Sequence, residues 1–197
     1  MDFKKFLPWI IAAVVLIGIY SWVKGINNTA VTLGQTVEQS WGDVQTSYQR
    51  RNDLIGNLVN TVKGAADFEK STLTAVIQAR ASATAVNIKA DDLTPANIQK
   101  FQAAQDQLSG ALSRLLVSVE KYPDLKANQN FLELQSQLEG TENRIAVARN
   151  DFNTSVQGYN SSALSFPTVI FAKMFGFAEK GFFQASDSAQ AAPSVKF

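Results

Sequence analysis

The stretch FLPWIIAAVVLIGIYSWV, from Phe6 to Val23, runs for eighteen positions without a charged residue. Lys4 and Lys5 precede it, and Lys24 follows it. A helix of roughly twenty apolar residues spans a bilayer, and aromatic rings near its ends favour the headgroup level. The stretch therefore predicts a transmembrane helix, with residues 1–24 as an N-terminal membrane anchor.

Two other interpretations of this stretch are a cleaved signal peptide and a buried core helix. A cleaved signal peptide has an apolar core of about 7–15 residues that ends in small residues. This run is longer and ends in Tyr20-Ser21-Trp22-Val23, which is a poor cleavage site. A buried core helix is seldom apolar on every face in so small a protein. We therefore favour a retained anchor.

Composition excludes several classes of function. The chain of 197 residues contains neither cysteine nor histidine, and its 18 basic residues nearly balance its 17 acidic ones. A Ser-His-Asp triad, the usual zinc site and a Glu-x-x-His di-iron site therefore cannot form. The balanced charge also lacks the positive field of a nucleic-acid-binding protein. We expect no enzymatic activity, no cofactor, no metal site and no nucleic-acid partner.

After the anchor, apolar residues recur three or four positions apart, which predicts long helices. The first is expected over Asn27 to Ala79, a rod of roughly 80 Å if it is continuous. The second begins at Thr94-Pro95, an N-cap followed by proline at the first helical position. It ends at Tyr122-Pro123, because the residue before proline resists helical geometry. Asp124 is positioned to cap a third helix that extends to Tyr159.

A short fourth helix is predicted over Phe166 to Phe177, FPTVIFAKMFGF. The tail over residues 184–197 is rich in Ala, Ser and Gln, and is expected to be disordered. No alternating strand pattern of useful length occurs in the sequence. The predicted fold class is therefore all-α, with an N-terminal transmembrane helix. A long antiparallel helical bundle over residues 25–183 follows, with three long helices and a short C-terminal helix.

Several motifs resemble those of the LemA family, which comprises small bacterial membrane-anchored helical proteins. They are Trp41-Gly42-Asp43-Val44-Gln45, Tyr48-Gln49-Arg50-Arg51-Asn52-Asp53-Leu54-Ile55, Tyr122-Pro123-Asp124-Leu125-Lys126-Ala127, Leu138-Glu139-Gly140-Thr141-Glu142-Asn143-Arg144-Ile145-Ala146, Phe152-Asn153 and Tyr159-Asn160. This chain departs from the family at Gly56, where proline is usual, and at Phe152-Asn153, where Tyr-Asn is usual. The resemblance implies a helical bundle on an anchor, no established catalytic activity, and in some relatives a role in shaping specialised membranes.

The predicted function is that of a non-enzymatic, membrane-anchored scaffold that self-associates and organises the bacterial membrane or envelope. The alternative is an adaptor or sensor that regulates a membrane-bound protease or another envelope partner. The expected location is the bacterial inner membrane, crossed once. Because Lys4 and Lys5 outnumber Lys24, the positive-inside rule places the bundle outside the cytoplasm.

An apolar stripe on the first long helix is the candidate interface of a homo-oligomer. The second helix is about half as long as the first, so we expect the membrane-proximal half of the first helix to lack a partner in its own chain. An exposed apolar stripe usually marks an interaction surface. Its residues are Val37, Trp41, Val44 and Tyr48. The alternative is a bent first helix, folded back at Gly42 or Gly56.

A structural ion network is the second candidate feature. Glu and Arg are seldom fully buried unless they are paired. If the first and third helices are neighbours, Glu69 should approach Arg144, and Arg80 should approach Glu142. Such a network would fix the register of the helices more than it would stabilise them.

Two charged pairs and one aromatic segment remain. Arg50-Arg51 could bind an acidic lipid headgroup, but we favour a structural pair with Arg51 on the apolar stripe and Arg50 in solvent. Asp91-Asp92 offers too few oxygen ligands for a hard cation. The aromatic segment is a candidate contact with the membrane or a partner, or else a helix that caps the bundle. Its residues are Phe166, Ile170, Phe171, Phe175 and Phe177.

Overall fold

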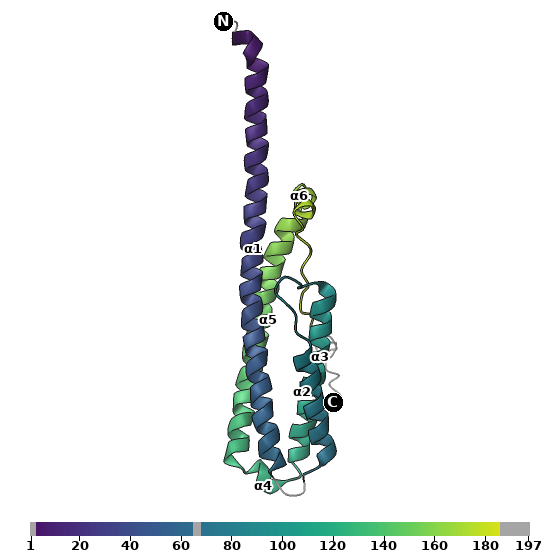
Figure 1. Cartoon of the computed structure of the whole chain (residues 1–197). Helices are drawn as coiled ribbons and strands as arrows, with labels where there is room; N and C mark the ends of the chain where they lie inside the picture. The colour runs from purple at the N-terminus through teal and green to yellow at the C-terminus, as the bar shows by residue number, and fades with distance from the viewer. Residues whose placement is uncertain (1–2, 65–67, 186–197) are drawn as a thin grey trace, which may run out of the picture.

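The computed structural model describes residues 3–64 and 68–185, and within these residues the chain consists of helices and loops without strands. The predicted all-α fold class is confirmed. The helices are α1 (Phe3–Lys63), α2 (Lys70–Ala85), α3 (Pro95–Val119), α4 (Pro123–Lys126), α5 (Gln129–Leu164) and α6 (Thr168–Met174). Figure 1 shows a slender bundle from which the N-terminal part of α1 projects alone.

The apolar N-terminal stretch and the start of the bundle form one uninterrupted helix, α1. Its N-terminal part is long and apolar enough to cross a membrane, and no residue of its most apolar window is buried. α1 continues past Lys24 into the bundle without a break at Gly42 or Gly56. The anchor is therefore joined to the bundle by helix rather than by a flexible linker.

The prediction of a single helix over Asn27 to Ala79 was wrong. α1 ends at Lys63, and the amide of Gly64 donates to the carbonyl oxygen of Asn60 at 3.2 Å. α2 then runs back toward the membrane side of the bundle (Figure 1). This reversal buries Leu73 and Val76 in the same core as the end of α1. A straight continuation would have left those side chains in water, at a cost of about 1.5–3 kcal/mol each.

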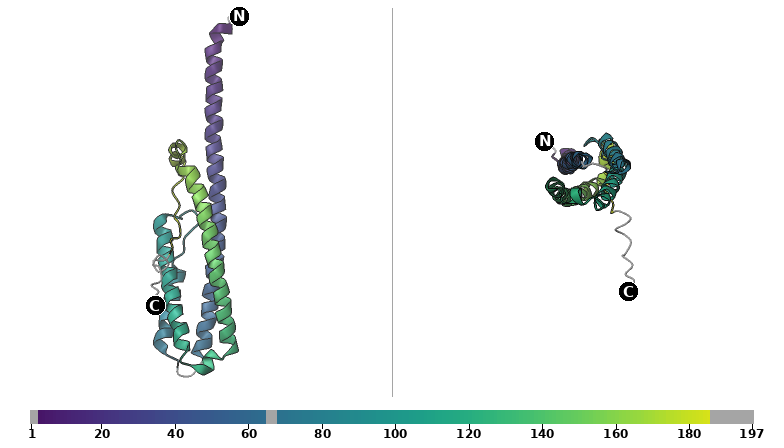
Figure 2. Two further views of the ribbon diagram at one scale, coloured as in Figure 1. Left: turned by 180° about the vertical axis from the view of Figure 1, so that it is seen from behind. Right: turned by 90° about the horizontal axis from the view of Figure 1, so that it is seen from below.

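The reversal sets the path of the rest of the chain. α3 runs away from the membrane side, α4 turns the chain at the far end, and α5 returns alongside α1 (Figure 2). The buried apolar residues form two clusters, a distal one near α4 and a proximal one nearer the anchor. α5 thus covers the length of α1 that was expected to lack a partner.

One of the two predicted helix caps is confirmed, and the other is wrong. Thr94 caps α3 as predicted, its side chain accepting from the amide of Asn97 at 3.4 Å. The third long helix is capped by Asn128 rather than by Asp124, which lies in the first turn of α4. The Asn128 side chain accepts from the amide of Asn130 at 3.0 Å. The short α4 therefore lies between α3 and α5, whereas the sequence predicted that the third long helix would begin directly after the second.

Candidate functional site

The stripe assigned to an oligomer interface is buried inside the chain. Val37, Trp41, Val44 and Tyr48 all belong to the proximal core. The indole nitrogen of Trp41 donates to the carbonyl oxygen of Ile88 at 3.2 Å. The expected exposure was wrong because it assumed that the third long helix starts halfway along the first. It starts at the far end instead, and α5 covers the stripe.

Aromatic rings fill the proximal core around Trp41. Its ring centroid lies 5.3 Å from that of Phe101 on α3 and 5.5 Å from that of Phe152 on α5. Phe183 stacks on the same indole at 6.2 Å, although it lies beyond α6. Edge-to-face and offset ring pairs contribute about 0.5–1.5 kcal/mol beyond the area they bury. The segment after α6 is therefore part of the core.

This segment, residues 176–185, is called here the C-terminal strap. Three amide side chains on α3 and α5 each donate to and accept from the backbone of one strap residue. Asn160 pairs with Lys180 at 2.8 and 3.0 Å. Asn153 pairs with Phe183 at 2.9 Å in both directions. The strap is thus held by backbone recognition at successive points rather than by regular secondary structure.

The strap continues into the tail that was expected to be disordered. Gln102 pairs with the backbone of Gln184 at 3.0 Å in both directions, and Arg149 donates to the same carbonyl oxygen at 2.9 Å. The predicted disorder at Gln184 was therefore wrong. Residues 186–197 lie outside the described part of the chain. Burial lowers the pKa of Lys180, whose ammonium lies 5.1 Å from the ring centroid of Tyr159.

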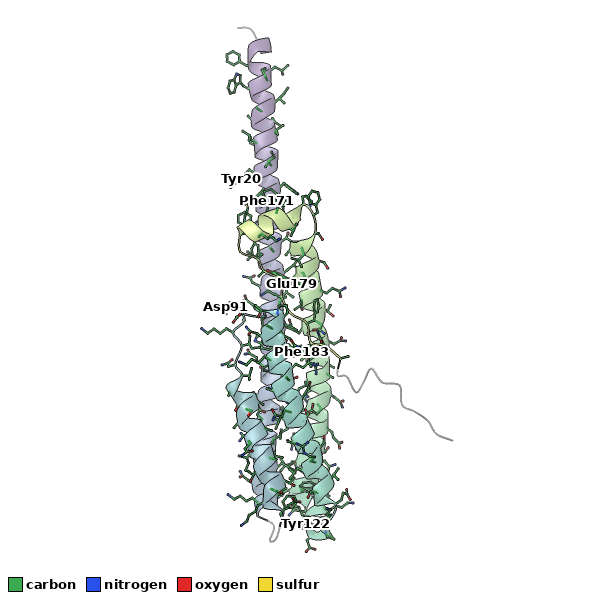
Figure 3. All side chains as sticks on the ribbon, turned by 90° about the vertical axis from the view of Figure 1, so that its right-hand side faces the viewer. Tyr20, Asp91, Tyr122, Phe171, Glu179 and Phe183 are labelled. Atoms are coloured by element: carbon green, nitrogen blue, oxygen red, sulfur yellow. The ribbon has the colours of Figure 1, made fainter. Side chains whose placement is uncertain are left out.

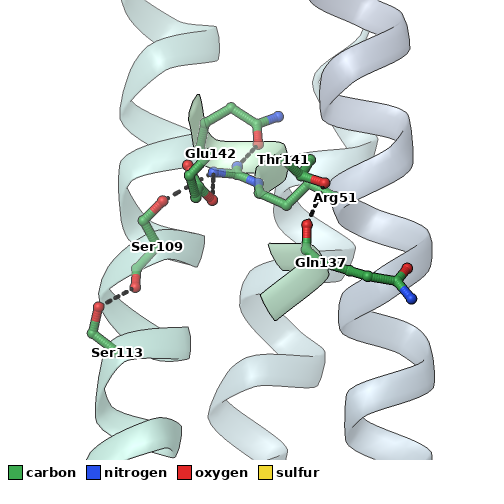
Figure 4. A network of polar contacts seen from close by, with 7 residues as sticks. Arg51, Ser109, Ser113, Gln137, Thr141 and Glu142 are labelled. Atoms are coloured by element: carbon green, nitrogen blue, oxygen red, sulfur yellow. Dashed lines mark hydrogen bonds and ion pairs between the residues drawn. The ribbon is translucent and has the colours of Figure 1, made fainter. Parts of the chain in front are cut away.

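A buried polar centre, separate from the strap, surrounds Arg51, which lies between α1, α3 and α5 (Figure 4). Its Nη1 donates to Ser109 Oγ at 3.0 Å and to Glu142 Oε1 at 3.1 Å. Its Nη2 donates to Gln105 Oε1. Its guanidinium carbon lies 4.8 Å from the ring centroid of Tyr48. A single charged side chain therefore joins three helices.

The expected ion network has different partners. Glu142 pairs with Arg51 rather than with Arg80, whose Nε donates to the carbonyl oxygen of Asn52 at 2.9 Å. Glu69 accepts from Ser71 beside it, and no ion pair joins it to Arg144 among the described residues. The reversal after α1 explains both misassignments, because it places Glu69 at the far end of the bundle and brings Arg80 back beside Asn52 of α1 (Figure 1).

The placement of the arginine pair was predicted correctly. Arg51 lies on the buried face of α1, whereas Arg50 is exposed. Burial raises the pKa of Tyr48 above its usual value, and the positive charges of Arg149 and Arg51 partly oppose that shift. Two buried atoms, Arg51 Nε and Asn52 Oδ1, find no hydrogen-bond partner in the described residues. The Arg51 side chain is enclosed by packed helices, and its contacts suit a structural role.

The aromatic segment forms α6 and its flanks at the membrane-proximal end of the bundle. Ala172 is buried, and Phe177 is half-buried against the proximal core. The ring of Phe171 packs edge-on against Trp22 of α1, with centroids 5.4 Å apart. Phe166, Ile170 and Phe175 remain exposed. The segment therefore caps the bundle with one face and exposes another.

Comparison with known sequences identifies the family. A sequence model of the LemA family matches residues 40–197. The chain belongs to the LemA family. It is 25% identical to Protein LemA of Metamycoplasma hominis, over 93% of this chain and 80% of that protein. The predicted family resemblance is confirmed.

The chain is also similar to proteins that are named for a bacterial organelle. The chain is 25% identical to Magnetosome protein MamQ 2 of Paramagnetospirillum magneticum, over 80% of this chain and 64% of that protein. It is 25% identical to Magnetosome protein MamQ of Magnetospirillum gryphiswaldense, over 79% of this chain and 64% of that protein. The chain thus spans slightly less than two thirds of the magnetosome relatives' length. None of these relatives is named for an enzymatic activity.

Sequence reasoning missed the strap, although a signal for it was present. Phe152-Asn153 and Tyr159-Asn160 repeat an aromatic-asparagine pair after seven residues, which is two helical turns. The aromatic member faces the core, and the asparagine reaches the strap. Asparagine is a poor helix former. Its repetition along one helix face therefore indicated a binding role for the side-chain amides.

Proposed function

We propose that this LemA family protein is a non-enzymatic scaffold that is anchored in the bacterial membrane and self-associates to organise that membrane. The observation that carries the proposal is the continuity of α1 from the apolar stretch into the bundle. A bundle fixed to a rigid membrane helix holds a set position and angle at the bilayer. Chains confined to one plane meet at high effective concentration, so modest affinity suffices for assembly.

The similarity to magnetosome proteins supports the same proposed function. Those relatives are named for a bacterial organelle, and the shared region covers most of this chain. The polar groups around Arg51 and along the strap are bound by other groups of the same chain, so they are not free to bind a second copy. A self-association surface must therefore lie on the outside of the bundle, not at the stripe around Trp41.

Cross-linking in intact membranes tests the proposal. We expect a ladder of products that contain only this chain, and a complex extracted in mild detergent with a mass of several copies. A single product that contains a different envelope protein would favour the adaptor or sensor function instead. A monomer in both measurements would refute self-association. A chain that carries Trp41→Ala is a useful comparison, because loss of its assembly would report disrupted folding rather than a lost surface.

A further inference from the structure

The membrane-proximal cap presents an apolar stripe that the bundle does not cover. Phe166, Ile170 and Met174 are spaced four residues apart, and their exposed fractions are 83%, 52% and 74%. Ile170 and Met174 lie within α6, and positions four apart share one face of a helix, whereas Phe166 lies in the turn just before α6. Ala172, which is buried, lies two positions from both Ile170 and Met174 and therefore faces the opposite side. α6 thus packs on the bundle through one side and exposes Ile170 and Met174 on the other, and Phe166 is exposed in the turn that precedes the helix.

The position of α6 along α1 indicates what covers this stripe. Phe171 contacts Trp22, which lies one residue before the end of the uncharged stretch. In Figure 3, α6 lies across the direction of α1, with Phe171 just below the level of Tyr20. If α1 crosses the bilayer along Phe6 to Val23, a helix perpendicular to it at Trp22 lies in the plane of the headgroups. The stripe then borders the same membrane that holds the anchor.

We propose that α6 is an interfacial helix, whose exposed Ile170 and Met174 enter the boundary between headgroups and acyl chains beside the anchor, together with Phe166 of the preceding turn. Amphipathic helices lie in this plane with aromatic and aliphatic side chains buried about 5–10 Å into the bilayer. Lys24 and Lys173 are both exposed and supply basic groups at this end of the molecule. Such groups favour anionic headgroups. The bundle is thereby docked on the membrane at a second point besides α1.

Site-specific fluorescence in vesicles tests this inference, because the chain contains no cysteine to interfere with labelling. The full chain with Met174→Cys carries an environment-sensitive fluorophore and is reconstituted into phosphatidylcholine–phosphatidylglycerol vesicles. Nitroxide spin labels are placed at a shallow acyl position of the lipid. The matched control is Val117→Cys at the far end of α3, an apolar residue with a similar exposed fraction of 69%. Circular dichroism checks that both proteins keep their helices.

The expected result is a blue-shifted emission and strong quenching by spin-labelled lipid at position 174, with neither effect at position 117. Equal exposure of the two labels to water would overturn the proposal. Protection of position 174 from aqueous iodide without quenching by lipid would also overturn it, because a second copy or another protein would then cover the stripe. The Ile170→Cys variant should behave like Met174→Cys, since it lies on the same face. These outcomes do not depend on whether the protein self-associates.

Discussion

At the scale of single residues, substitution of Arg51 is expected to have the largest effect on the free energy of unfolding. Its charge is removed from water and compensated by Glu142, Gln105 and Ser109. Replacing Arg51 with Ala leaves a void and unpaired polar groups, and should lower the free energy of unfolding by about 3–5 kcal/mol. The Glu142 side chain is 43% exposed. Solvent therefore screens its charge, and Glu142→Ala should cost only about 1–2 kcal/mol.

Chemical unfolding followed by circular dichroism in mild detergent measures both losses. The double variant should lose less than the sum of the single losses, because the two residues share one interaction. Additive losses would show that the ion pair contributes nothing. Glu139→Ala is the matched control, since Glu139 lies one turn earlier on α5 and is exposed. Its effect should stay within about 0.5 kcal/mol.

At the scale of elements, the strap depends on a close approach that only glycine permits. A Cβ atom at Gly181 would lie 2.6 Å from the Cα of Pro95, and the amide of Gly181 donates to the carbonyl oxygen of Leu93 at 2.9 Å. Gly181→Ala should therefore displace the strap and release Phe183 from the core. The expected cost is about 2–3 kcal/mol, the burial energy of that ring. Helix content should stay almost unchanged.

Hydrogen exchange and limited proteolysis detect the released strap. In Gly181→Ala, the amides of Lys180, Phe183 and Gln184 should lose protection, because their acceptors are the side chains of Asn160, Asn153 and Gln102. Gly158→Ala is the control, since a Cβ there meets no atom within 4 Å. It should stabilise α5 by up to about 1 kcal/mol. If the strap amides remain protected in Gly181→Ala, the backbone at Pro95 must have shifted to make room for the added methyl group.

The sequence predicts the elements better than their contacts. The apolar stretch, the cap at Thr94 and the buried placement of Arg51 follow from local pattern and propensity. The break after Gly64 does not, because the apolar spacing of α1 and α2 is compatible with one long helix. That single reversal changes which helix covers Trp41 and which acid meets Arg51. The strap was also missed, since it depends on amides that folding brings together across 20 to 82 positions.

At the scale of the whole molecule, the bundle is attached to the anchor as one rigid piece. α1 passes through the boundary at Lys24 as a helix, and α6 contacts it at Trp22. Thermal motion therefore cannot swing the bundle freely about a linker, as it does where anchor and domain are joined by a glycine- or serine-rich segment. In the proposed scaffold function, this rigid junction would transmit the geometry of an assembly to the bilayer.

The side of the membrane on which this rod projects is set by the charges that flank the apolar stretch. Lys4 and Lys5 lie before it and Lys24 after it, so the positive-inside rule favours a cytoplasmic N-terminus. We expect protease added to spheroplasts to degrade the bundle while cytoplasmic marker proteins survive. Cleavage only after the inner membrane is ruptured would establish the reverse orientation. A variant with Lys5→Gln leaves one lysine on each side of the apolar stretch and should yield a mixed population, whereas Lys63→Gln at the far end of α1 should leave the orientation unchanged.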